Sequence, residues 1–203
     1  MPYRHADRDR VLPAWRDSAL CTARTPSEVR PPHGRTADAP QGIHRLSAQF
    51  PHTGRIERIF VRPARRTACI ELNGTLAVAG RGLEGDRSHG GRRQLSLIQH
   101  EHLPVIAALI GAEAIEPALL RRNLVISGIN LLALKPLGRE RTVDLRIGDV
   151  IVRIGQACSP CSRMEEILGA GGYNAMRGHG GMLATILTDG WIKVGSEVRV
   201  IHC

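Results

Sequence analysis

Two cysteines separated by two residues, Cys158 and Cys161, have the strongest capacity for metal or redox chemistry in this chain. A predicted strand leads into a Cys-Ser-Pro-Cys turn, and a short helical pattern follows it. Ser162 and Glu165 match a capping box, which makes Ser162 the expected N-cap and places Cys161 just outside the helix. Helix N-termini favour a thiolate, and Arg163 adds positive charge nearby. Cys161 is therefore a candidate metal ligand or nucleophile.

Other interpretations of this cysteine pair stay open at this point. A structural zinc site needs about four ligands, whereas the remaining candidates, Cys69, His179 and Cys203, are scattered along the chain. A thioredoxin-like redox pair needs a βαβ context that the surrounding sequence does not suggest. An isolated pair can also be two small apolar side chains at a turn. A disulfide framework is disfavoured, because the five cysteines are sparse and no export signal is recognisable.

A glycine-rich cationic segment, Gly80–Gln94, is a second candidate for ligand binding. Glycines let backbone N–H groups approach an anion closely, and Arg87, Arg92 and Arg93 could bind phosphate through charge-assisted hydrogen bonds. The alternative is a solvated loop in which Asp86 pairs locally with an arginine.

Two further segments place polar side chains next to predicted strands. Arg121, Arg122 and Asn123 precede an apolar run, so they are expected where a strand begins, as site residues or as a solubilising charge pair. The segment Asn174–Gly181 offers an arginine and a histidine among glycines, but a single histidine is weak support for a ligand.

The elements that must position these residues are mainly short strands. Runs of β-type residues predict strands over Arg55–Val61, Leu95–Gln99, Asn123–Ser127, Val150–Gln156, Leu183–Leu187 and Glu197–Ile201. His100–Ile110 has the length and composition of a helix with Pro104 in its first turn, and Glu116–Arg122 predicts a shorter one. The expected fold class is a mainly β barrel or sandwich with a few short helices. No internal repeat and no dinucleotide-binding glycine fingerprint is found.

Residues 1–53 differ from the rest, because they are arginine-rich and lack a sustained period of 2 or 3.6. We expect a flexible or disordered extension over 1–53, followed by one folded domain over 54–203. A short helix around Val11–Leu20 is the alternative. The arginine-rich start resembles an organelle transit peptide only loosely, because it also contains several aspartates.

Composition narrows the class of ligand. The 28 basic and 19 acidic residues give a formal net charge of +9, and only Lys135 and Lys193 are lysines. Arginine suits phosphate and oxyanion recognition, although charge alone cannot distinguish nucleic acid, anionic membrane surfaces and phosphorylated small molecules. An aromatic fraction of 3% disfavours stacking platforms for nucleic-acid bases. No apolar run is long enough to span a bilayer, so a cytoplasmic protein that does not bind membranes is expected.

Taken in order, these segments resemble the MOSC domain family, named after the C-terminal domain of molybdenum-cofactor sulfurases, and the small stand-alone bacterial members in particular. The Gly-Leu-x-Gly-Asp-Arg loop is Gly82–Arg87, the Arg-x-Asn-Leu strand is Arg121–Gly128, and the Ile-Gly-Asp strand is Ile147–Asp149. Cys161 matches the late cysteine, and a terminal strand containing Val194-Gly195-Ser196 follows. The resemblance covers about residues 55–200.

The resemblance implies a strand-rich, barrel-like domain that binds the molybdenum cofactor, a pterin (molybdopterin) bearing a dithiolene and a phosphate. It assigns Cys161 as the metal ligand and catalytic residue. The positions that hold or orient the pterin and its phosphate are then Asp86, Arg87, His89, Arg93, Arg121 and Asn123. Soft thiolate, arginines and glycine loops suit such a group. The chain is too short for the desulfurase domain of the larger relatives, so their full sulfurase activity is not expected.

The expected function is that of a molybdenum oxidoreductase that reduces N-hydroxylated small molecules such as hydroxylamino purines or amidoximes. The chain has no ferredoxin-type cysteine run, so electrons are expected from a separate donor protein. The non-enzymatic alternative is a carrier of the cofactor, or of sulfur as a persulfide on Cys161. A nucleic-acid-binding module is a third possibility, disfavoured by the low aromatic content.

Overall fold

The computed structural model describes residues 42–91, 93–135 and 142–202. Most of the predicted N-terminal extension, and with it the alternative helix Val11–Leu20, lies outside these residues. The described part of the extension contains one short helix, α1 (Ile43–Ser47). The first strand of the main sheet then begins at Gly54, where the folded domain was predicted to start.

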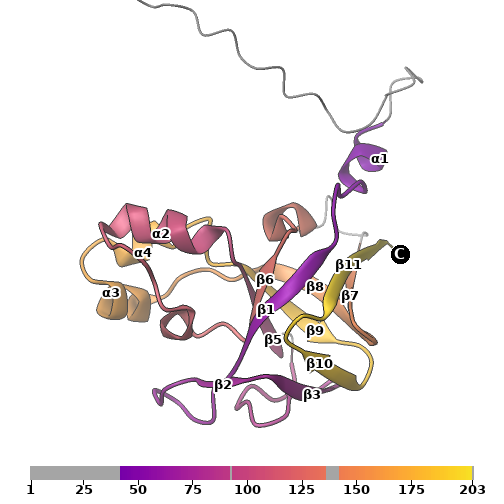
Figure 1. The fold of residues 1–203 in the computed structure, drawn as a ribbon, viewed down its shortest axis with the longest axis horizontal. Coiled ribbons are helices and arrows are strands. Elements are labelled where there is room, and N and C mark those ends of the chain that lie inside the picture. The colour runs from indigo at the N-terminus through magenta and orange to yellow at the C-terminus, as the bar shows by residue number, and fades with distance from the viewer. Residues whose placement is uncertain (1–41, 92, 136–141, 203) are drawn as a thin grey trace, which may run out of the picture. The chain divides into compact units, whose positions relative to one another are not determined.

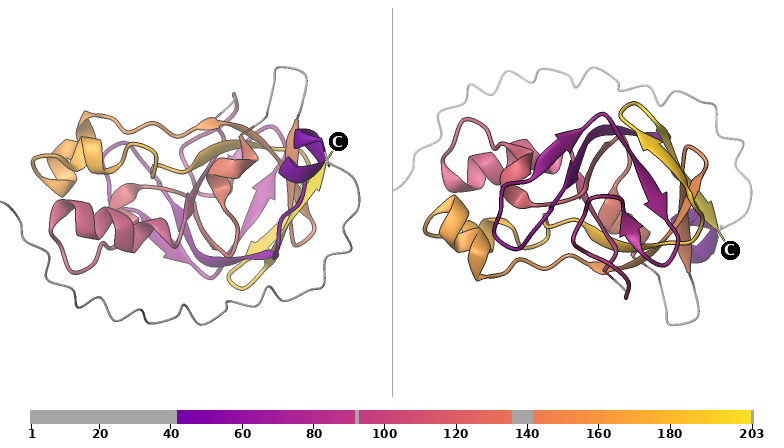
Figure 2. Two further views of the ribbon diagram at one scale, coloured as in Figure 1. Left: turned by 90° about the horizontal axis from the view of Figure 1, so that it is seen from above. Right: turned by 90° about the horizontal axis from the view of Figure 1, so that it is seen from below.

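Seven strands close into a β-barrel (Figures 1 and 2). In barrel order they are β11 (Glu197–His202), β7 (Val143–Ile147), β8 (Val150–Ala157), β9 (Met182–Ile186), β5 (Leu95–Gln99), β6 (Leu124–Ser127) and β1 (Gly54–Val61). Antiparallel pairing of β1 with β11, Gly54 opposite Val198 and Arg55 opposite Glu197, completes the ring. Closure leaves no free edge on these strands, which makes the barrel a self-contained frame.

Four shorter strands lie outside the ring. β2 (Ile70–Leu72) pairs with the end of β1, and β10 (Gly190–Lys193), β3 (Gly74–Val78) and β4 (Gly82–Leu83) form a small antiparallel sheet. The predicted cationic segment Gly80–Gln94 contains β4 and continues after it. The loop after β1 and the loop after β4 therefore each start at the end of a strand that is held in a sheet.

One pair in the barrel is parallel, β5 with β6, and a parallel pair needs a crossover connection. Here α2 (His102–Ile110) and the 3₁₀ helix η1 (Pro117–Leu120) supply it. Pro104 is the third residue of α2, in the first turn as predicted, where its missing N–H costs no helical hydrogen bond. η1 is shorter than the helix predicted over Glu116–Arg122 and ends at Arg121, which adopts a left-handed φ of 58°.

The remaining helices are α3 (Ser162–Leu168), α4 (Gly172–Ala175) and the 3₁₀ helix η2 (Leu131–Leu134). Figures 1 and 2 show α2, α3 and α4 gathered at one end of the barrel. A small apolar core joins α2, α3 and α4 to the outer faces of β1, β5 and β6; it includes Phe60, Ile98, Ile106, Val125, Met164 and Met176. The helices thus fix the position of the loops between them.

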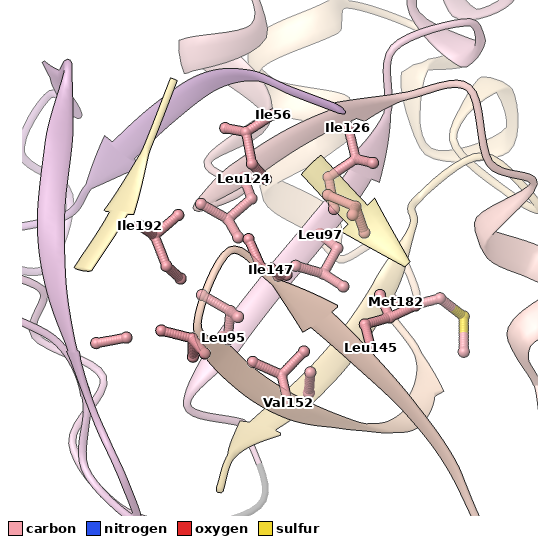
Figure 3. Close-up of a cluster of buried hydrophobic side chains, with 14 of the residues drawn as sticks. Ile56, Leu95, Leu97, Leu124, Ile126, Leu145, Ile147, Val152, Met182 and Ile192 are labelled. Carbon is pink, nitrogen blue, oxygen red and sulfur yellow. The ribbon is translucent and has the colours of Figure 1, made fainter. Parts of the chain in front are cut away.

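The main core fills the barrel itself (Figure 3), where aliphatic side chains from all seven strands point inward. Its members include Ile56, Leu95, Leu97, Leu124, Ile126, Leu145, Ile147, Val152, Met182 and Ile192, and all of these are fully buried. Alternate strand residues face this core, as the geometry of a β-strand requires. The barrel interior is therefore packed with apolar side chains among the described residues.

The predicted fold class is confirmed, and each of the six predicted strands is present within one or two residues of its expected bounds. Three local predictions were wrong. Ile147 ends β7, and Gly148-Asp149 is the tight turn into β8; Val194-Gly195-Ser196 is likewise a turn, before β11. Gly148 and Gly195 have φ values of 58° and 85°, which suit turns and not strands. Finally, Cys158 to Cys161 contains no hydrogen-bonded turn.

Within the described residues, no helix is both long enough and apolar enough to cross a lipid bilayer.

Candidate functional site

A buried ion pair links the end of β1 to the loop after β4. The carboxylate of Asp86, 1% exposed, accepts hydrogen bonds from Arg62 Nε and Nη2, both at 2.9 Å, and from the backbone N–H groups of Arg62 and Ser88, both at 2.8 Å. Burial alone would raise the pKa of Asp86, but the bonds from Arg62 and Ser88 outweigh it and lower that pKa to about 2. Asp86 therefore stays ionised and holds Arg62 in place.

Asn123 extends this network into the barrel wall. Its Nδ2 donates to Asp86 Oδ2 at 2.9 Å and to the carbonyl of Phe60 at 3.1 Å. Its Oδ1 accepts from Ser96 Oγ at 2.8 Å and from Arg62 Nη2 at 3.0 Å. Asn123 is fully buried because it stands just before β6, beside β5 in the parallel pair. The polar atoms of Asp86 and Asn123 are thus all hydrogen-bonded within the protein, and both residues act as positioning residues for Arg62.

Arg122 is a buried cation, only 8% exposed. Its guanidinium donates from Nε to the carbonyl of Gly180 at 2.8 Å and from Nη1 to the carbonyl of Leu120 at 2.9 Å. No carboxylate of the described chain lies within 4 Å of it. Burial lowers the pKa of Arg122, while the nearby thiols of Cys158 and Cys161 act in the opposite direction. A buried cation of this kind favours an anionic ligand beside the two thiols.

More arginines converge on the same region. Arg121 is half-buried and donates to the carbonyls of Thr67 and Ala64. Burial lowers the pKa of Arg121, and so do the charges of three neighbouring arginines, Arg163, Arg62 and Arg87. The group Arg62, Arg87, Arg121, Arg122 and Arg163 is called the arginine cluster below.

The charge of the arginine cluster is not balanced within the described chain. Asp86 is the one carboxylate paired with a member of it there. In addition, Nε of Arg163 is buried without a hydrogen-bond partner. Cys69 lies in the same region, and its burial raises the pKa of its thiol despite the nearby Arg121 and Arg62. The excess of positive charge makes this surface suited to a phosphate or another anion.

Cys161 stands at the edge of the arginine cluster, as the N-cap residue of α3. The capping-box prediction was wrong in its details: Ser162 is the first helical residue, and no side chain caps the helix. Glu165 instead accepts hydrogen bonds from the backbone N–H groups of Gly171 and Tyr173, both at 2.8 Å, and so ties α3 to α4. The thiol of Cys161 is exposed, as a ligand or nucleophile must be.

Cys158 is half-buried at the end of β8, where its N–H donates to the carbonyl of Gly181 at 2.8 Å. The two residues that approach this part of the chain, Gly180 and Gly181, leave no room for a side chain. A Cβ on Gly180 would collide with the carbonyl of Cys158, and one on Gly181 would collide with the carbonyl of Leu97. The close approach of these backbones brings Cys158, Gly180 and Arg122 together.

Comparison with known families decides which group of proteins this architecture represents. A sequence model of the MOSC domain matches residues 84–199, more than half of the chain and the whole span from Asp86 to Cys161. The chain belongs to the MOSC domain family. MOSC domains are typically related to the molybdenum cofactor. A search of curated proteins finds no match.

Solved structures share the MOSC fold. The YuaD protein of Bacillus subtilis has a TM-score of 0.61 and 19% identity, over 74% of this chain and 96% of YuaD. YiiM from Escherichia coli has a TM-score of 0.54 and 19% identity, over 72% of this chain and 69% of YiiM. YiiM from Geobacillus stearothermophilus has a TM-score of 0.55 and 15% identity, over 73% of this chain and 75% of that YiiM. At these identities the similarity concerns the fold.

The structure brings together only part of the residue set predicted for this MOSC domain. Arg87 and Arg121 belong to the arginine cluster, and Asp86 and Asn123 lie beneath it. His89 and Arg93 are exposed on the loop after β4, and no described contact connects their side chains with the arginine cluster. Arg92 lies outside the described residues. His179 packs edge-to-face on His102, with ring centroids 4.9 Å apart.

Sequence reasoning missed Arg62 altogether, and it noted Arg122, Arg163 and Cys158 without assigning them to the cofactor site. Arg122 adjoins the motif residues Arg121 and Asn123, so its position was a usable signal. No sequence signal marked Arg62, because the ion pair that positions it is made with Asp86, 24 positions away. Among the described residues, no three His, Cys, Asp or Glu side chains gather as a metal-ligand group.

Proposed function

We propose that this MOSC protein binds the molybdenum cofactor at the arginine cluster and catalyses reduction of N-hydroxylated small molecules. The observation that carries the proposal is Arg122, a buried guanidinium without a carboxylate partner in the described chain, beside the thiols of Cys158 and Cys161. Family membership supports the choice of cofactor.

The residues present fit this cofactor in charge and in donor chemistry. Its phosphate is an anion, and arginines bind phosphate through short, paired hydrogen bonds. Arg122 offers a buried guanidinium group for it, and Arg121 and Arg163 add half-buried ones, that of Arg163 with a buried Nε that has no partner. Cysteine thiolates are soft, electron-rich ligands for redox-active transition metals. Cys161, exposed beside this positive charge, is the residue we assign as the metal ligand and catalytic thiolate.

The molybdenum cofactor, when bound, supplies the two-electron redox chemistry that no side chain of the protein provides. The overall reaction is R–NH–OH + 2 H⁺ + 2 e⁻ → R–NH₂ + H₂O, in which the N–O bond breaks and the oxygen leaves as water. A separate reduced electron-donor protein supplies the electrons. The protein's own residues bind the anionic group, hold the thiolate next to it, and through Gly180 and Gly181 allow a close approach of the backbone.

The first test is molybdenum and pterin analysis of protein purified from a host that makes the cofactor. Wild type should retain both in near-stoichiometric amounts, and Cys161→Ser should lose most of the metal because a hydroxyl is a harder and poorer ligand. Cys158→Ser is the matched control and should have the milder effect. Equal loss in both variants would exclude a single thiolate ligand, and zinc in place of molybdenum would contradict the proposal.

The second measurement separates an enzyme from a carrier. Wild-type protein with bound cofactor should reduce benzamidoxime when supplied with dithionite-reduced methyl viologen. Retention of the cofactor without turnover, together with a persulfide on Cys161 detected by mass spectrometry, would instead support the carrier. Arg122→Met should lose pterin in either case, because both functions need the same anion site.

A further inference from the structure

A pocket is lined by Cys158 and by other residues that do not belong to the arginine cluster. It has a cavity volume of about 190 Å³ and lies between the chain after β8 and the segment that contains α4. Its lining consists of Leu132, Ala157, Cys158, Ser159, Pro160, Tyr173, Arg177, Gly178, Gly180 and Gly181. Cavities of about 150 Å³ accommodate a benzene ring, so this pocket accepts a molecule of one substituted ring.

The lining determines which kind of ring-shaped molecule fits. Tyr173, whose side chain is exposed, offers an aromatic face, and Leu132 and Pro160 offer apolar surface. Arg177 is the one charged residue in the lining, and the described chain places no carboxylate within 4 Å of its guanidinium. The pocket therefore combines apolar walls with one free cation.

The backbone N–H group of Gly180 adds a second hydrogen-bond donor to the pocket lining. Gly180 is buried and lines the pocket, yet its N–H donates to no acceptor of the described chain. Buried N–H groups without a partner are rare, because leaving one unsatisfied costs free energy. Gly180 and Arg177 thus bring two hydrogen-bond donors without a described partner to the lining of one pocket, which favours a ligand that carries acceptor groups.

We propose that this pocket binds the substrate, and that it selects planar N-hydroxylated compounds that carry a carboxylate or a comparable anionic acceptor. The inference rests on the proposed function and assigns Tyr173 and Arg177 as specificity residues. Cys158 and Pro160 line the pocket, and the assigned metal ligand Cys161 is the next residue along the chain after Pro160. Arg177 lines this pocket, whereas no member of the arginine cluster does.

The test compares two substrates that differ by one charge, benzamidoxime and 4-carboxybenzamidoxime, with dithionite-reduced methyl viologen as electron donor. Wild-type holoprotein should show the lower KM for the carboxylate. Arg177→Gln should raise that KM about 10-fold or more, the value of a lost charge-assisted hydrogen bond, and should change the KM for benzamidoxime less than about 2-fold. Tyr173→Leu should raise both KM values, because both substrates use the aromatic face.

The matched control is Arg146→Gln, which removes an exposed arginine on β7, outside the pocket lining. It should leave both KM values unchanged. Equal effects of Arg177→Gln on the two substrates would overturn the charge assignment. Loss of molybdenum and pterin from Arg177→Gln would assign the pocket to the cofactor and overturn the proposal as well.

A binding measurement keeps this inference distinguishable from the proposed function. Ligand-observed NMR on cofactor-free protein should detect benzoate binding more strongly than benzamide binding, and Arg177→Gln should abolish the difference. If the protein never retains molybdenum, the proposed function fails while this measurement still reports on the pocket. Equal signals for benzoate and benzamide in wild type would overturn the anionic preference.

Discussion

Arg62 connects the arginine cluster to the barrel. It follows directly after β1, and its guanidinium contacts Asp86, Ser88 and Asn123 while it belongs to the arginine cluster. In the proposed cofactor site, the acidic and amide residues of the family motifs therefore act on the ligand through Arg62. Their role is to hold a cation at a fixed place, which fits the general need for binding groups to be oriented before the ligand arrives.

The Asp86 carboxylate should make the free energy of unfolding fall as the pH becomes strongly acidic. Its folded pKa of about 2 lies below the ordinary value of 3.8, so its contribution is fully present above pH 4 and is lost as the pH falls towards 2. The difference corresponds to about 2 kcal/mol. Urea unfolding of wild type between pH 5 and pH 2 should show this loss, and Asp86→Asn should remove that part of the pH dependence.

At neutral pH, Asp86→Asn should cost about 3 to 5 kcal/mol, because it leaves Arg62 largely buried without its charged partner. Asp149→Asn is the control, since this aspartate is exposed in the turn between β7 and β8. An identical pH dependence in wild type and Asp86→Asn below pH 4 would show that Asp86 is not the group responsible.

At the scale of elements, the short helices α3 and α4 are coupled by one side chain. Glu165 of α3 receives the N–H groups of Gly171 and Tyr173, the donors at the start of α4 that no helical carbonyl can satisfy. The segment that follows α4 contains Gly180, to which Arg122 is bonded. The contact therefore stabilises one wall of the pocket that contains Tyr173 and Arg177.

Hydrogen exchange should detect this coupling. Glu165→Ala should lower the protection of the Gly171 and Tyr173 amides severalfold while the barrel strands keep theirs, because only the local contact is lost. The bonds from Tyr173 and Gly171 lower the pKa of Glu165 below 4.5, so in wild type the protection should persist above pH 4.5 and fall under more acidic conditions. Glu166→Ala, the exposed neighbour, is the control; equal loss in both variants would contradict the specific role of Glu165.

At the scale of the whole molecule, periodicity was enough to predict the fold class but not the complete sheet. Strands such as Leu95–Gln99 are long and apolar, and their pattern is visible locally. β4 has only two residues and β2 has two of three residues exposed, so neither has a detectable period. The parallel pairing of β5 with β6 depends on contacts distant in sequence, and no local pattern reports it.

The candidate site was predictable to a similar degree. Motif spacing pointed to Asp86, Arg121, Asn123 and Cys161, because these positions occur in recognisable local patterns. Which arginine is buried could not be predicted, since the burial of Arg122 depends on a carbonyl 58 residues later in the chain. The same limit applies to Arg62 and to the pocket residues Tyr173 and Arg177. Ligand sites that assemble from distant segments become visible only in the folded protein.

The predicted division of the chain into an extension and a folded domain leads to a final prediction. Phe50 precedes β1 and packs, partly buried, against the barrel core, and residues 50–53 line a groove together with Arg199 and Val200 of β11. Deletion of residues 2–41 should change the free energy of unfolding by less than about 0.5 kcal/mol, as for a surface extension. Deletion of residues 2–53 should cost about 1 to 2 kcal/mol, because the apolar burial of Phe50 is lost. Urea denaturation measures both, and full-length Phe50→Ala should reproduce the larger loss; equal stabilities of the two truncated proteins would place the domain boundary at Gly54.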